Sequence, residues 1–387
     1  MSRRALLATG GAVALLGGCG LFDGGPQARR VTGGFRLAGV TGVTRIAQLT
    51  GPGALNDTAA VLLAGADLGH MTTVGDRTFF VFGDNFGERD PEAYGGVGDI
   101  WRSNALAWST SDDPSAGIRF DGWILNEYGQ AKEILPSDHR PNEVVGETTK
   151  IPTQLFAVGQ TLYLAYMSVT HWGAPGEWTA GHAGLARSTD LGQNWEFLPE
   201  VRWAGESNFV QLAQVPLTAD GRDWIYLWGI PAGRFGSVKL MRVPADDAAV
   251  TDPTAYRYFA GTDGDQPRWS ADEADAVVVL DGPVGELSVM WSTHLERWLL
   301  TTMADNADAV VHEGLSPWGP WSAPHTITTQ RETPGLYAPY MAPRYVSDDG
   351  RRVYFTLSIW GPYQVFWYSM DLLLAGAEGQ PGPEQNS

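Results

Sequence analysis

The sequence predicts an all-β fold, and within that class a five-bladed β-propeller, from three observations. A turn glycine followed by a short apolar strand occurs five times, at Gly75, Gly159, Gly221, Gly285 and Gly350. The last four of these glycines are 62, 64 and 65 residues apart, and the first gap of 84 residues leaves room for an insertion. The chain also has 48 glycines and 43% hydrophobic residues but no dominant amphipathic helical stretch, which suits a turn-rich β domain. Repeated hairpin units are typical of radial β arrays, and a β-sandwich with chance glycine spacing is the alternative.

Each unit is expected to begin with an inner strand that ends at the turn glycine. The predicted inner strands are residues 60–74, 147–158, 208–216, 274–280 and 337–346. A second, apolar strand follows each glycine, at residues 79–82, 162–166, 225–228, 287–291 and 353–357. The inner strands of a propeller line its central channel, and ligands usually bind at one mouth of that channel. We therefore expect the functional residues on or beside the inner strands.

The first 19 residues are predicted to be a lipoprotein signal peptide. Arg3 and Arg4 form a basic start, and residues 5–16 are an apolar run too short to span a bilayer. Residues 16–19 (LGGC) resemble a bacterial lipobox, in which Cys19 is acylated, and residues 2–7 resemble a twin-arginine export signal. The alternative is an incidental cysteine in a cleaved leader. We expect an exported protein held at the outer face of the cell membrane by its N-terminal lipid alone.

The rest of the chain divides into three predicted parts: a flexible tether at residues 20–34, the propeller at 35–374 and a disordered tail at 375–387. The formal net charge is −18, and it becomes −20 when Arg3 and Arg4 are cleaved off. This acidity disfavours nucleic acid and anionic lipid as ligands of the domain and suits a neutral substrate. The only cysteine is Cys19, so no disulfide within the domain can stabilise it. We also expect the domain to act as a monomer.

Motifs for other chemistries do not stand out. The sequence contains no Walker-type phosphate loop, no Cys/His pattern with zinc spacing and no G-x-S-x-G. A nucleophilic Ser-His-Asp triad with a different spacing is not excluded by the sequence and is an alternative. The sequence predicts no cofactor, and no ligand loop specifies a metal ion, although a structural calcium in the acidic channel is an alternative.

Two carboxylates in the first predicted hairpin carry the strongest chemical signal. Asp67 precedes Leu68-Gly69, and Asp84 follows Gly83. An Asp within a strand is disfavoured and costly to bury, so two in one hairpin need a functional reason. Glycoside hydrolysis requires such a pair: one carboxyl protonates the leaving oxygen, and the other activates water or attacks directly. A separation of about 6.5–9.5 Å would predict inversion, and about 5–5.5 Å retention.

Two further acids are candidates by position. Glu147 and Glu206 each follow a glycine and precede a hydroxyl residue at the start of the second and third inner strands. Either could form a catalytic pair with Asp67 across the channel. The alternative is that both are solvated loop residues.

Residues 188–195 (STDLGQNW) match the Asp-box of sialidase-like propellers. We expect this box to be structural: Asp190 caps turn amides, Gly192 takes a positive φ and Trp195 packs between strands. The motif also prompts a sialidase-like hydrolase as a further alternative. That function would require an arginine cluster for the substrate carboxylate, and no such cluster is evident in the sequence.

Several polar and aromatic residues near the predicted mouth are expected to bind substrate, because Trp and Tyr faces stack on sugar rings and neutral His donates to hydroxyls. They are His171, Trp172, Asn208, Tyr340 and Trp360. Blade packing is the alternative for the aromatic residues. The insertion at residues 111–145 is expected to wall or cover the site.

The motifs Asp67-Leu68-Gly69 and Phe82-Gly83-Asp84, with Phe86 following, resemble those of a family of actinobacterial exported propellers long catalogued as a domain of unknown function. Members are regarded as endo-acting D-arabinanases that cut the arabinan of mycobacterial arabinogalactan and lipoarabinomannan. The resemblance covers residues 35–374 and implies a five-bladed propeller glycosidase with Asp67 and Asp84 as the catalytic pair and D-arabinan as substrate. Asn85 departs from the small hydroxyl residue expected there. A propeller that binds envelope glycan without cutting it is the alternative function.

Overall fold

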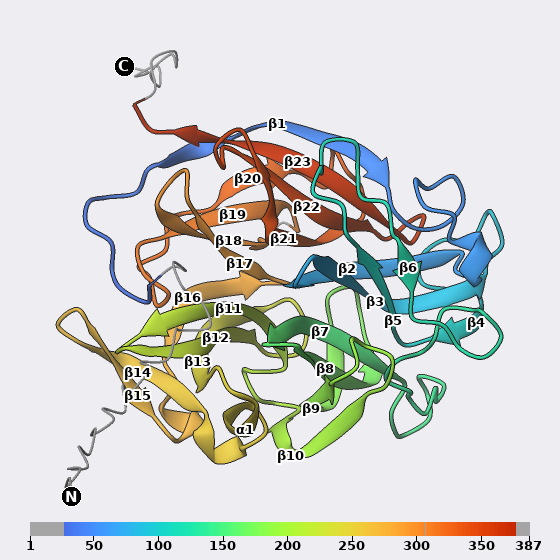
Figure 1. Cartoon of the computed structure of the whole chain (residues 1–387), viewed down its shortest axis with the longest axis horizontal. Helices are drawn as coiled ribbons and strands as arrows, with labels where there is room; N and C mark the ends of the chain where they lie inside the picture. Colours follow the sequence, from blue (N-terminus) through green and yellow to red (C-terminus); the bar gives the residue numbers. More distant parts are fainter. Residues whose placement is uncertain (1–26, 306, 377–387) are drawn as a thin grey trace, which may run out of the picture.

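The computed structural model describes residues 27–305 and 307–376. The predicted signal peptide with Cys19, residues 20–26 of the predicted tether and residues 377–387 of the predicted tail lie outside this part. Five antiparallel sheets are arranged radially around a central axis (Figure 1), which confirms the predicted five-bladed β-propeller. Among the described residues, no helix has the length and apolar character needed to cross a bilayer.

The first two blades follow the predicted order of hairpins. Blade 1 consists of β2 (Gly65–Val74), β3 (Arg77–Glu88), β5 (Ala105–Ser109) and β6 (Gly122–Trp123), with β4 (Asp99–Arg102) also pairing with β3. Blade 2 consists of β7 (Thr149–Val158), β8 (Thr161–Trp172), β9 (Trp178–Ser188) and β10 (Glu196–Ala204).

Blade 3 is the largest. It consists of β11 (Gln211–Ala219), β12 (Arg222–Ile230), β13 (Gly236–Pro244), β14 (Arg257–Asp263) and β15 (Gln266–Ser270), with β16 (Val278–Val284) also pairing with β13. Three short helical segments follow β13 or β15: α1 (Asp247–Val250) and the 3-10 turns Pro253–Ala255 and Glu273–Asp275.

The last two blades complete the ring. Blade 4 consists of β17 (Ser288–Ser292), β18 (Arg297–Met303), β19 (Ala309–Gly314) and β20 (His325–Thr328). Blade 5 consists of β21 (Leu336–Ser347), β22 (Arg352–Ile359), β23 (Gln364–Leu374) and β1 (Leu37–Gln48). The first strand of the chain therefore pairs with the last one and closes the propeller, a closure that the hairpin pattern did not predict.

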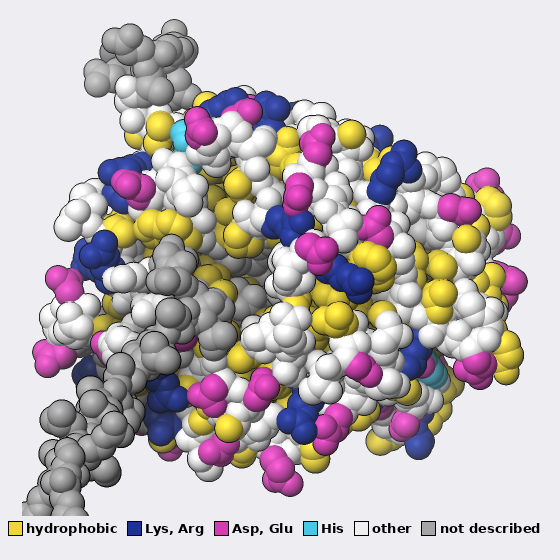
Figure 2. Space-filling view, viewed as in Figure 1, with side chains coloured by type: hydrophobic (Ala, Val, Ile, Leu, Met, Phe, Trp, Pro, Cys, Tyr) yellow, Lys and Arg dark blue, Asp and Glu magenta, His cyan; other side chains and the backbone are white. Residues whose placement is uncertain are grey.

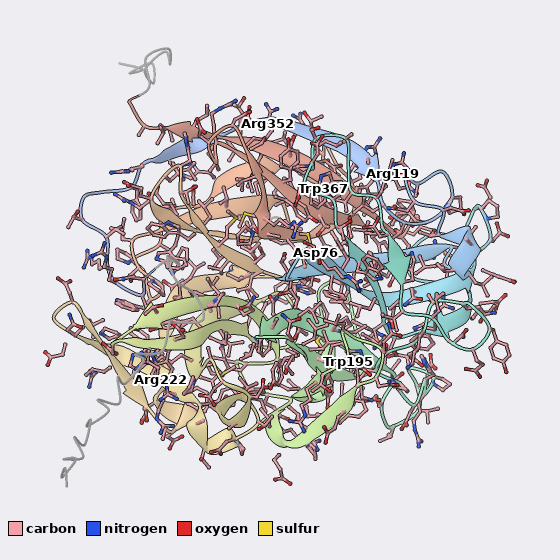
Figure 3. The ribbon with its side chains drawn as sticks, in the orientation of Figure 1. Asp76, Arg119, Trp195, Arg222, Arg352 and Trp367 are labelled. Atoms are coloured by element: carbon pink, nitrogen blue, oxygen red, sulfur yellow. The ribbon has the colours of Figure 1, made fainter. Side chains whose placement is uncertain are left out.

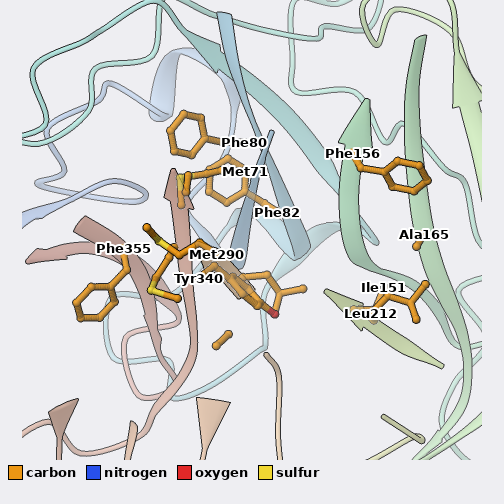
Figure 4. Packing of buried hydrophobic residues seen from close by; sticks show 14 of the residues in the cluster. Met71, Phe80, Phe82, Ile151, Phe156, Ala165, Leu212, Met290, Tyr340 and Phe355 are labelled. Carbon is orange, nitrogen blue, oxygen red and sulfur yellow. The ribbon is translucent and has the colours of Figure 1, made fainter. Parts of the chain in front are cut away.

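The inner strands form the wall of the channel. Each of β2, β7, β11, β17 and β21 contacts the next in this order, and β21 contacts β2 again. Apolar side chains from different inner strands meet in one buried cluster: Figure 4 shows Met71 of β2, Met290 of β17 and Tyr340 of β21 close together. Burial on both faces explains why these strands are apolar along most of their length.

Two of the predicted inner strands differ from the structure, one of them entirely. Residues 278–284 form β16 at the outer side of blade 3, so 274–280 is not the inner strand of blade 4; that strand is β17. The turn after β17 has Glu296, not a glycine, in the left-handed region (φ 53°), and Gly285 precedes the strand instead. In blade 1, residues 59–61 form a 3-10 turn and the inner strand begins at Gly65 rather than at residue 60.

The insertion between β5 and β7 joins blade 1 to blade 5. Trp367 of β23, labelled in Figure 3, donates a hydrogen bond of 2.9 Å to the Pro114 carbonyl. The Asp-box turn, marked in the same view by Trp195, is as predicted: Asp190 accepts from the Asn194 amide at 2.9 Å, and Gly192 has φ 89°. Trp195 packs against the apolar cluster between blades 1 and 2.

Residues 27–34, the described part of the predicted tether, lie against blades 3 and 4. The Ala28 amide donates to the Thr218 carbonyl at 3.2 Å, and the Val31 amide donates to the Leu315 carbonyl at 2.8 Å. The Arg297 guanidinium donates to the Gly34 carbonyl at 2.8 Å. Backbone groups of residues 27–34, which were predicted to belong to a flexible tether, therefore find partners on the propeller.

Candidate active site

A cavity of about 290 Å³ lies at the end of the channel where the inner strands begin. Every blade contributes to it: Asp67 from β2, Ile151 from β7, Gln211 from β11, Leu287 just before β17 and Tyr337 from β21. Convergence of all five blades on one hollow matches the general position of ligand sites in propellers.

The hairpin β2–β3 carries a β-bulge at the two acids. Ala66 pairs with Asn85 and Leu68 pairs with Phe82, so Asp67 alone faces both Gly83 and Asp84. A bulge of this kind bends the strand and redirects side chains, and bulges are common beside active sites. Here it lets Asp67 and Asp84, from neighbouring strands, both line the cavity.

The residues beside the acids explain the local motif. Leu68 and Gly69 both have positive φ, at 65° and 100°, which is unusual for a leucine and ordinary for a glycine. A Cβ atom at Gly83 would overlap Asp67 Oδ1 and approach Leu68 Cδ1 to 2.9 Å. The Asp67 carboxyl group therefore occupies space that only a glycine at position 83 leaves free.

Asp67 is held by one end of its carboxyl group. The Tyr337 hydroxyl donates to Oδ2 at 2.9 Å, whereas Oδ1 is buried without a hydrogen-bond partner among the described residues. Burial raises the pKa of Asp67 to about 8, with a further rise from the charge of Asp84, and the hydroxyl groups of Tyr337 and Tyr363 oppose the shift. At neutral pH this carboxyl group holds a proton.

Asp84 has more partners that favour its anion. The Thr149 hydroxyl and the Trp101 indole both donate to Oδ1, at 2.5 and 2.8 Å. Burial still raises the pKa of Asp84 to about 7, while these two hydrogen bonds and the positive charge of His139 lower it. Asp84 is therefore the more easily ionised member of the pair, and the two acids titrate as a coupled system near neutral pH.

The insertion contributes a charged pair behind Asp84 that the sequence did not single out. His139 Nε2 lies 2.7 Å from Glu133 Oε1, and the His139 ring contacts Trp101 edge to face, with 4.6 Å between centroids. The hydrogen bond with Glu133 raises the pKa of His139. The insertion thus contacts Trp101 of β4, which in turn binds Asp84. The residues of the insertion itself do not line the cavity.

A second pair missing from the sequence prediction lies across the cavity. Arg234 and Glu286 form a two-point ion pair with distances of 2.8 and 2.6 Å, and the guanidinium lies over the ring of Tyr337 at 5.0 Å. Glu286 follows Gly285 two residues before the start of β17, so it repeats the Gly-Glu pattern of Glu147 and Glu206. That pattern would have found it, had Gly285 not been assigned to a turn.

The structure does not place Glu147 or Glu206 in the cavity. Glu147 is ion-paired with Lys150 and accepts from the Ser168 hydroxyl at 2.5 Å. Glu206 is exposed in the connection between β10 and β11. Neither therefore shares a pocket with Asp67, and of the four predicted acids only Asp67 and Asp84 are brought together.

Three of the five predicted substrate-binding residues line the cavity: Trp172, Tyr340 and Trp360. His171 is exposed beside them, with Nδ1 3.2 Å from the Asn142 carbonyl, and does not line the cavity. Asn208 is a structural residue, because its amide nitrogen donates to the Gly229 and Ser237 carbonyls at 2.8 and 3.0 Å.

The floor of the cavity is closed by a stacked pair. The rings of His70 and Tyr340 are 3.6 Å apart between centroids at an interplanar angle of 28°. Burial lowers the pKa of His70 to about 3, so its imidazole is neutral. His70, Trp178 and Tyr363 also line the cavity and were not predicted. Within the described ranges, no three His, Cys, Asp or Glu side chains are grouped so as to hold a metal ion.

Comparison with known proteins gives a family match and distant structural likenesses. Residues 53–369 match the family described as Domain of unknown function (DUF4185). No curated protein matches the sequence.

Among solved structures, a candidate hydrolase from Bacteroides ovatus is similar over 80% of this chain and 86% of its own, with 13% identity and a TM-score of 0.51. An exo-β-1,3-galactanase from Phanerochaete chrysosporium is 11% identical over 84% of this chain and 66% of its own, with a TM-score of 0.49. A family 117 glycoside hydrolase from Zobellia galactanivorans is 11% identical over 87% and 91%, with a TM-score of 0.46. At these identities the likeness concerns the fold alone.

Proposed function

The chain belongs to the DUF4185 family of domains of unknown function, and we propose that it is a glycoside hydrolase in which Asp67 and Asp84 form the catalytic pair. The observation that carries the proposal is the placement of both carboxyl groups in one cavity, where burial raises the pKa of Asp67 to about 8 and that of Asp84 to about 7. Two carboxyl groups near neutral pKa in a shared pocket are what acid–base cleavage of a glycosidic bond requires.

The environments of the two acids support different roles. Asp67 holds its proton more tightly, and its Oδ1 has no partner within the described structure, so it can donate a proton to the leaving glycosidic oxygen. Asp84 is stabilised as an anion by Thr149 and Trp101, so it can take a proton from the attacking water or attack the sugar carbon itself. The glycosidic C–O bond breaks as Asp67 releases its proton.

The lining supports a neutral sugar as substrate. Trp172, Trp178 and Trp360 present aromatic surface to the cavity, and the formal net charge of −18 disfavours anionic polymers. With the sequence resemblance, this leads us to D-arabinan as the substrate and to endo action. We also propose export and lipid anchoring through Cys19, which rest on the sequence pattern.

The alternative functions find less support. A non-catalytic glycan-binding propeller would be favoured if the two acids were neutralised by arginines, but their hydrogen-bond donors are Tyr337, Thr149 and Trp101. A sialidase-like site needs several arginines for the substrate carboxylate. Among the described residues that line the cavity, Arg234 is the single arginine, and it is bound to Glu286.

The test is release of reducing ends from purified D-arabinan. The wild-type protein should release oligosaccharides, and Asp67→Asn or Asp84→Asn should reduce the rate by at least about 10³-fold with the fold retained. Glu206→Gln is the matched control, because this acid is exposed outside the cavity, and it should keep full activity. Full activity in Asp67→Asn would contradict the assignment.

A further inference from the structure

Aromatic rings extend outward from the cavity on two of its sides, three of them exposed and two, Trp172 and Trp178, half-buried. We propose that they form two platforms that hold the sugar rings of one polysaccharide chain on either side of the bond that is cut. The blade 5 platform is Tyr94 with Trp360, and the blade 3 platform is Phe235 with Trp172 and Trp178. This inference rests on the proposed function and deepens it, since it assigns the binding sites that endo action needs.

All five rings come from equivalent places in the propeller. Trp172 ends β8 and Trp178 begins β9, Phe235 precedes β13, Trp360 follows β22, and Tyr94 lies between β3 and β4. These are the connections from the second strand of a blade to the next one. Because neighbouring strands are antiparallel, these connections lie at the end of the propeller where the inner strands begin, which is also the end that holds the cavity.

The blade 5 platform is held in place by close backbone packing but open to solvent. Trp360 is 44% exposed and Tyr94 is 73% exposed. A Cβ atom at Gly95 would lie 2.6 Å from the Trp360 ring, and one at Gly361 would lie 3.2 Å from the Tyr94 ring. The Gly95 amide also donates to the Gly361 carbonyl at 3.0 Å, which ties the two segments together.

The blade 3 platform is built in a similar way. Phe235 is 62% exposed, and its ring lies 3.2 Å from the Cβ position of Gly176 in the β8–β9 connection. The Arg234 amide donates to the Gly176 carbonyl at 2.9 Å, and the Arg234 guanidinium lies over the Trp178 ring at 5.6 Å. Trp172 and Trp178 contact each other at 5.7 Å between centroids.

The two platforms lie across the channel from each other. One is at the junction of blades 5 and 1 and the other at the junction of blades 2 and 3, so blades 1 and 2 separate them on one side and blades 3 to 5 on the other. Both are continuous with the cavity, because Trp360 lines it on one side and Trp172, Trp178 and Arg234 line it on the other.

The size and character of this surface fit a neutral polysaccharide chain. The cavity volume of about 290 Å³ is just below the range of about 300–1,000 Å³ for ligand pockets, so the cavity can hold only part of a polymer. Exposed rings offer flat apolar surface to the C–H faces of sugars while the hydroxyl groups remain in water. An acidic polymer is disfavoured by the net charge of −18.

The experiment measures binding without hydrolysis. The full-length Asp67→Asn protein would be titrated with purified linear D-arabinan in affinity gel electrophoresis, alone and with Tyr94→Ala or Phe235→Ala added. We expect each added change to weaken binding about 5- to 10-fold. Tyr128→Ala is the matched control: Tyr128 is 76% exposed, its amide is bound by the Asn126 side chain, and it does not line the cavity. It should leave binding unchanged.

Three outcomes would overturn the proposal: no binding of the polymer by the Asp67→Asn protein, binding insensitive to both changes, or binding sensitive to one platform only. In the active protein, both changes should slow cleavage of the polymer more than cleavage of the shortest cleavable oligosaccharide. If both platforms contribute to binding but the wild-type protein releases no reducing ends, the proposed hydrolase function fails and the binding inference stands. If the protein cleaves D-arabinan at a rate that neither platform change affects, this inference fails and the proposed hydrolase function stands.

Discussion

The Tyr337 hydroxyl donates a 2.9 Å hydrogen bond to Asp67 Oδ2 across 270 residues of sequence, from the inner strand of blade 5 to that of blade 1. These strands become neighbours only when the ring of blades is closed. Closure of the propeller is therefore coupled directly to the charge and orientation of the acid that we assign as proton donor.

The first prediction concerns this hydrogen bond. Tyr337→Phe keeps the ring and removes the hydroxyl donor, so the ionised form of Asp67 loses a stabilising partner and the pKa of Asp67 rises above its value of about 8. Because Asp67 must be protonated to act as the acid, the alkaline limb of the pH–activity profile should move to higher pH, by up to about one unit. The profile of kcat/KM on D-arabinan measures this shift.

Tyr354→Phe is a suitable control for a change of the same kind. Tyr354 is on β22 in the same blade and contacts Ser347 and Trp367 rather than the cavity. Loss of the Tyr354 hydroxyl group should leave both limbs of the pH–activity profile in place. An unshifted alkaline limb in Tyr337→Phe would mean that Asp67 does not control that limb.

The second prediction concerns the space at Gly83. A methyl group at this position overlaps Asp67 Oδ1, so Gly83→Ala must displace the carboxyl group. Misplacement of a catalytic group by about 1 Å typically costs about 10²-fold in rate, and we expect a loss of that order in kcat. Gly75→Ala is the control, since its Cβ would meet nothing within 4 Å. With a φ of 60°, Gly75→Ala should lower the free energy of unfolding by about 1 kcal/mol and leave kcat unchanged.

Much of this site follows from the sequence, and the failures have definite causes. The motif around Asp67 and Asp84 identified the acids because the bulge that unites them is local to one hairpin. Thr149, Trp101 and Tyr337 were not predicted as their partners, because each comes from another strand and meets them only in the assembled ring.

The fourth blade shows a different cause of failure. Its turn between β17 and β18 places Glu296, not a glycine, in the left-handed region. The turn-glycine pattern therefore predicts the inner strand of blade 4 one strand too early in the chain and does not indicate Glu286. Glu147 shows the limit of positional analogy. It has the same Gly-Glu pattern as Glu286, but Lys150 and Ser168 hold it away from the cavity.

The third prediction links the site to stability. Burial raises the pKa of Asp67 from 3.8 to about 8, so between these values the folded protein binds a proton that the unfolded chain has released. The stabilising effect is complete below about pH 4 and is lost as the pH rises through about 8. Asp67→Asn has no such loss, so it should be more stable than the wild type at pH 9, by about 1–3 kcal/mol.

Urea unfolding of the two proteins at several pH values measures this difference. The gap should close as the pH falls toward 4, where both side chains are neutral. Glu206→Gln, at an exposed site, should show no such dependence on pH. A gap that widens in acid would show that the buried carboxyl group is stabilised as an anion instead.

The fourth prediction concerns anchoring. If Cys19 is acylated, Cys19→Ser should move the protein from the membrane fraction to the soluble exported fraction with kcat on D-arabinan unchanged, because the propeller does not depend on the lipid. Fractionation of cells and of the medium, with metabolic labelling by a fatty acid, distinguishes the two proteins. Membrane retention of Cys19→Ser would contradict a single N-terminal lipid anchor.

The last prediction concerns the charged pair behind Asp84. The His139 imidazole, whose pKa is raised by its hydrogen bond with Glu133, lowers the pKa of Asp84 through its positive charge. His139→Gln removes that charge, so the pKa of Asp84 should rise and the acidic limb of the pH–activity profile should move to higher pH, by about half a unit or less at this distance.

The charge balance around His139 makes the direction testable. Glu133 and Asp84 both favour its protonated form, and Glu147 adds a weaker contribution from the β7 side. Glu133→Gln should therefore lower the pKa of His139 and shift the acidic limb in the same direction as His139→Gln, although the loss of the negative charge of Glu133, which itself raises the pKa of Asp84, reduces the shift. His294→Gln, in the β17–β18 turn at the opposite end of the inner strands, is the control and should leave the limb in place. An acidic limb that stays in place in His139→Gln would show that the imidazole carries no charge at this pH and that Asp84 owes its ionisation to Thr149 and Trp101 alone.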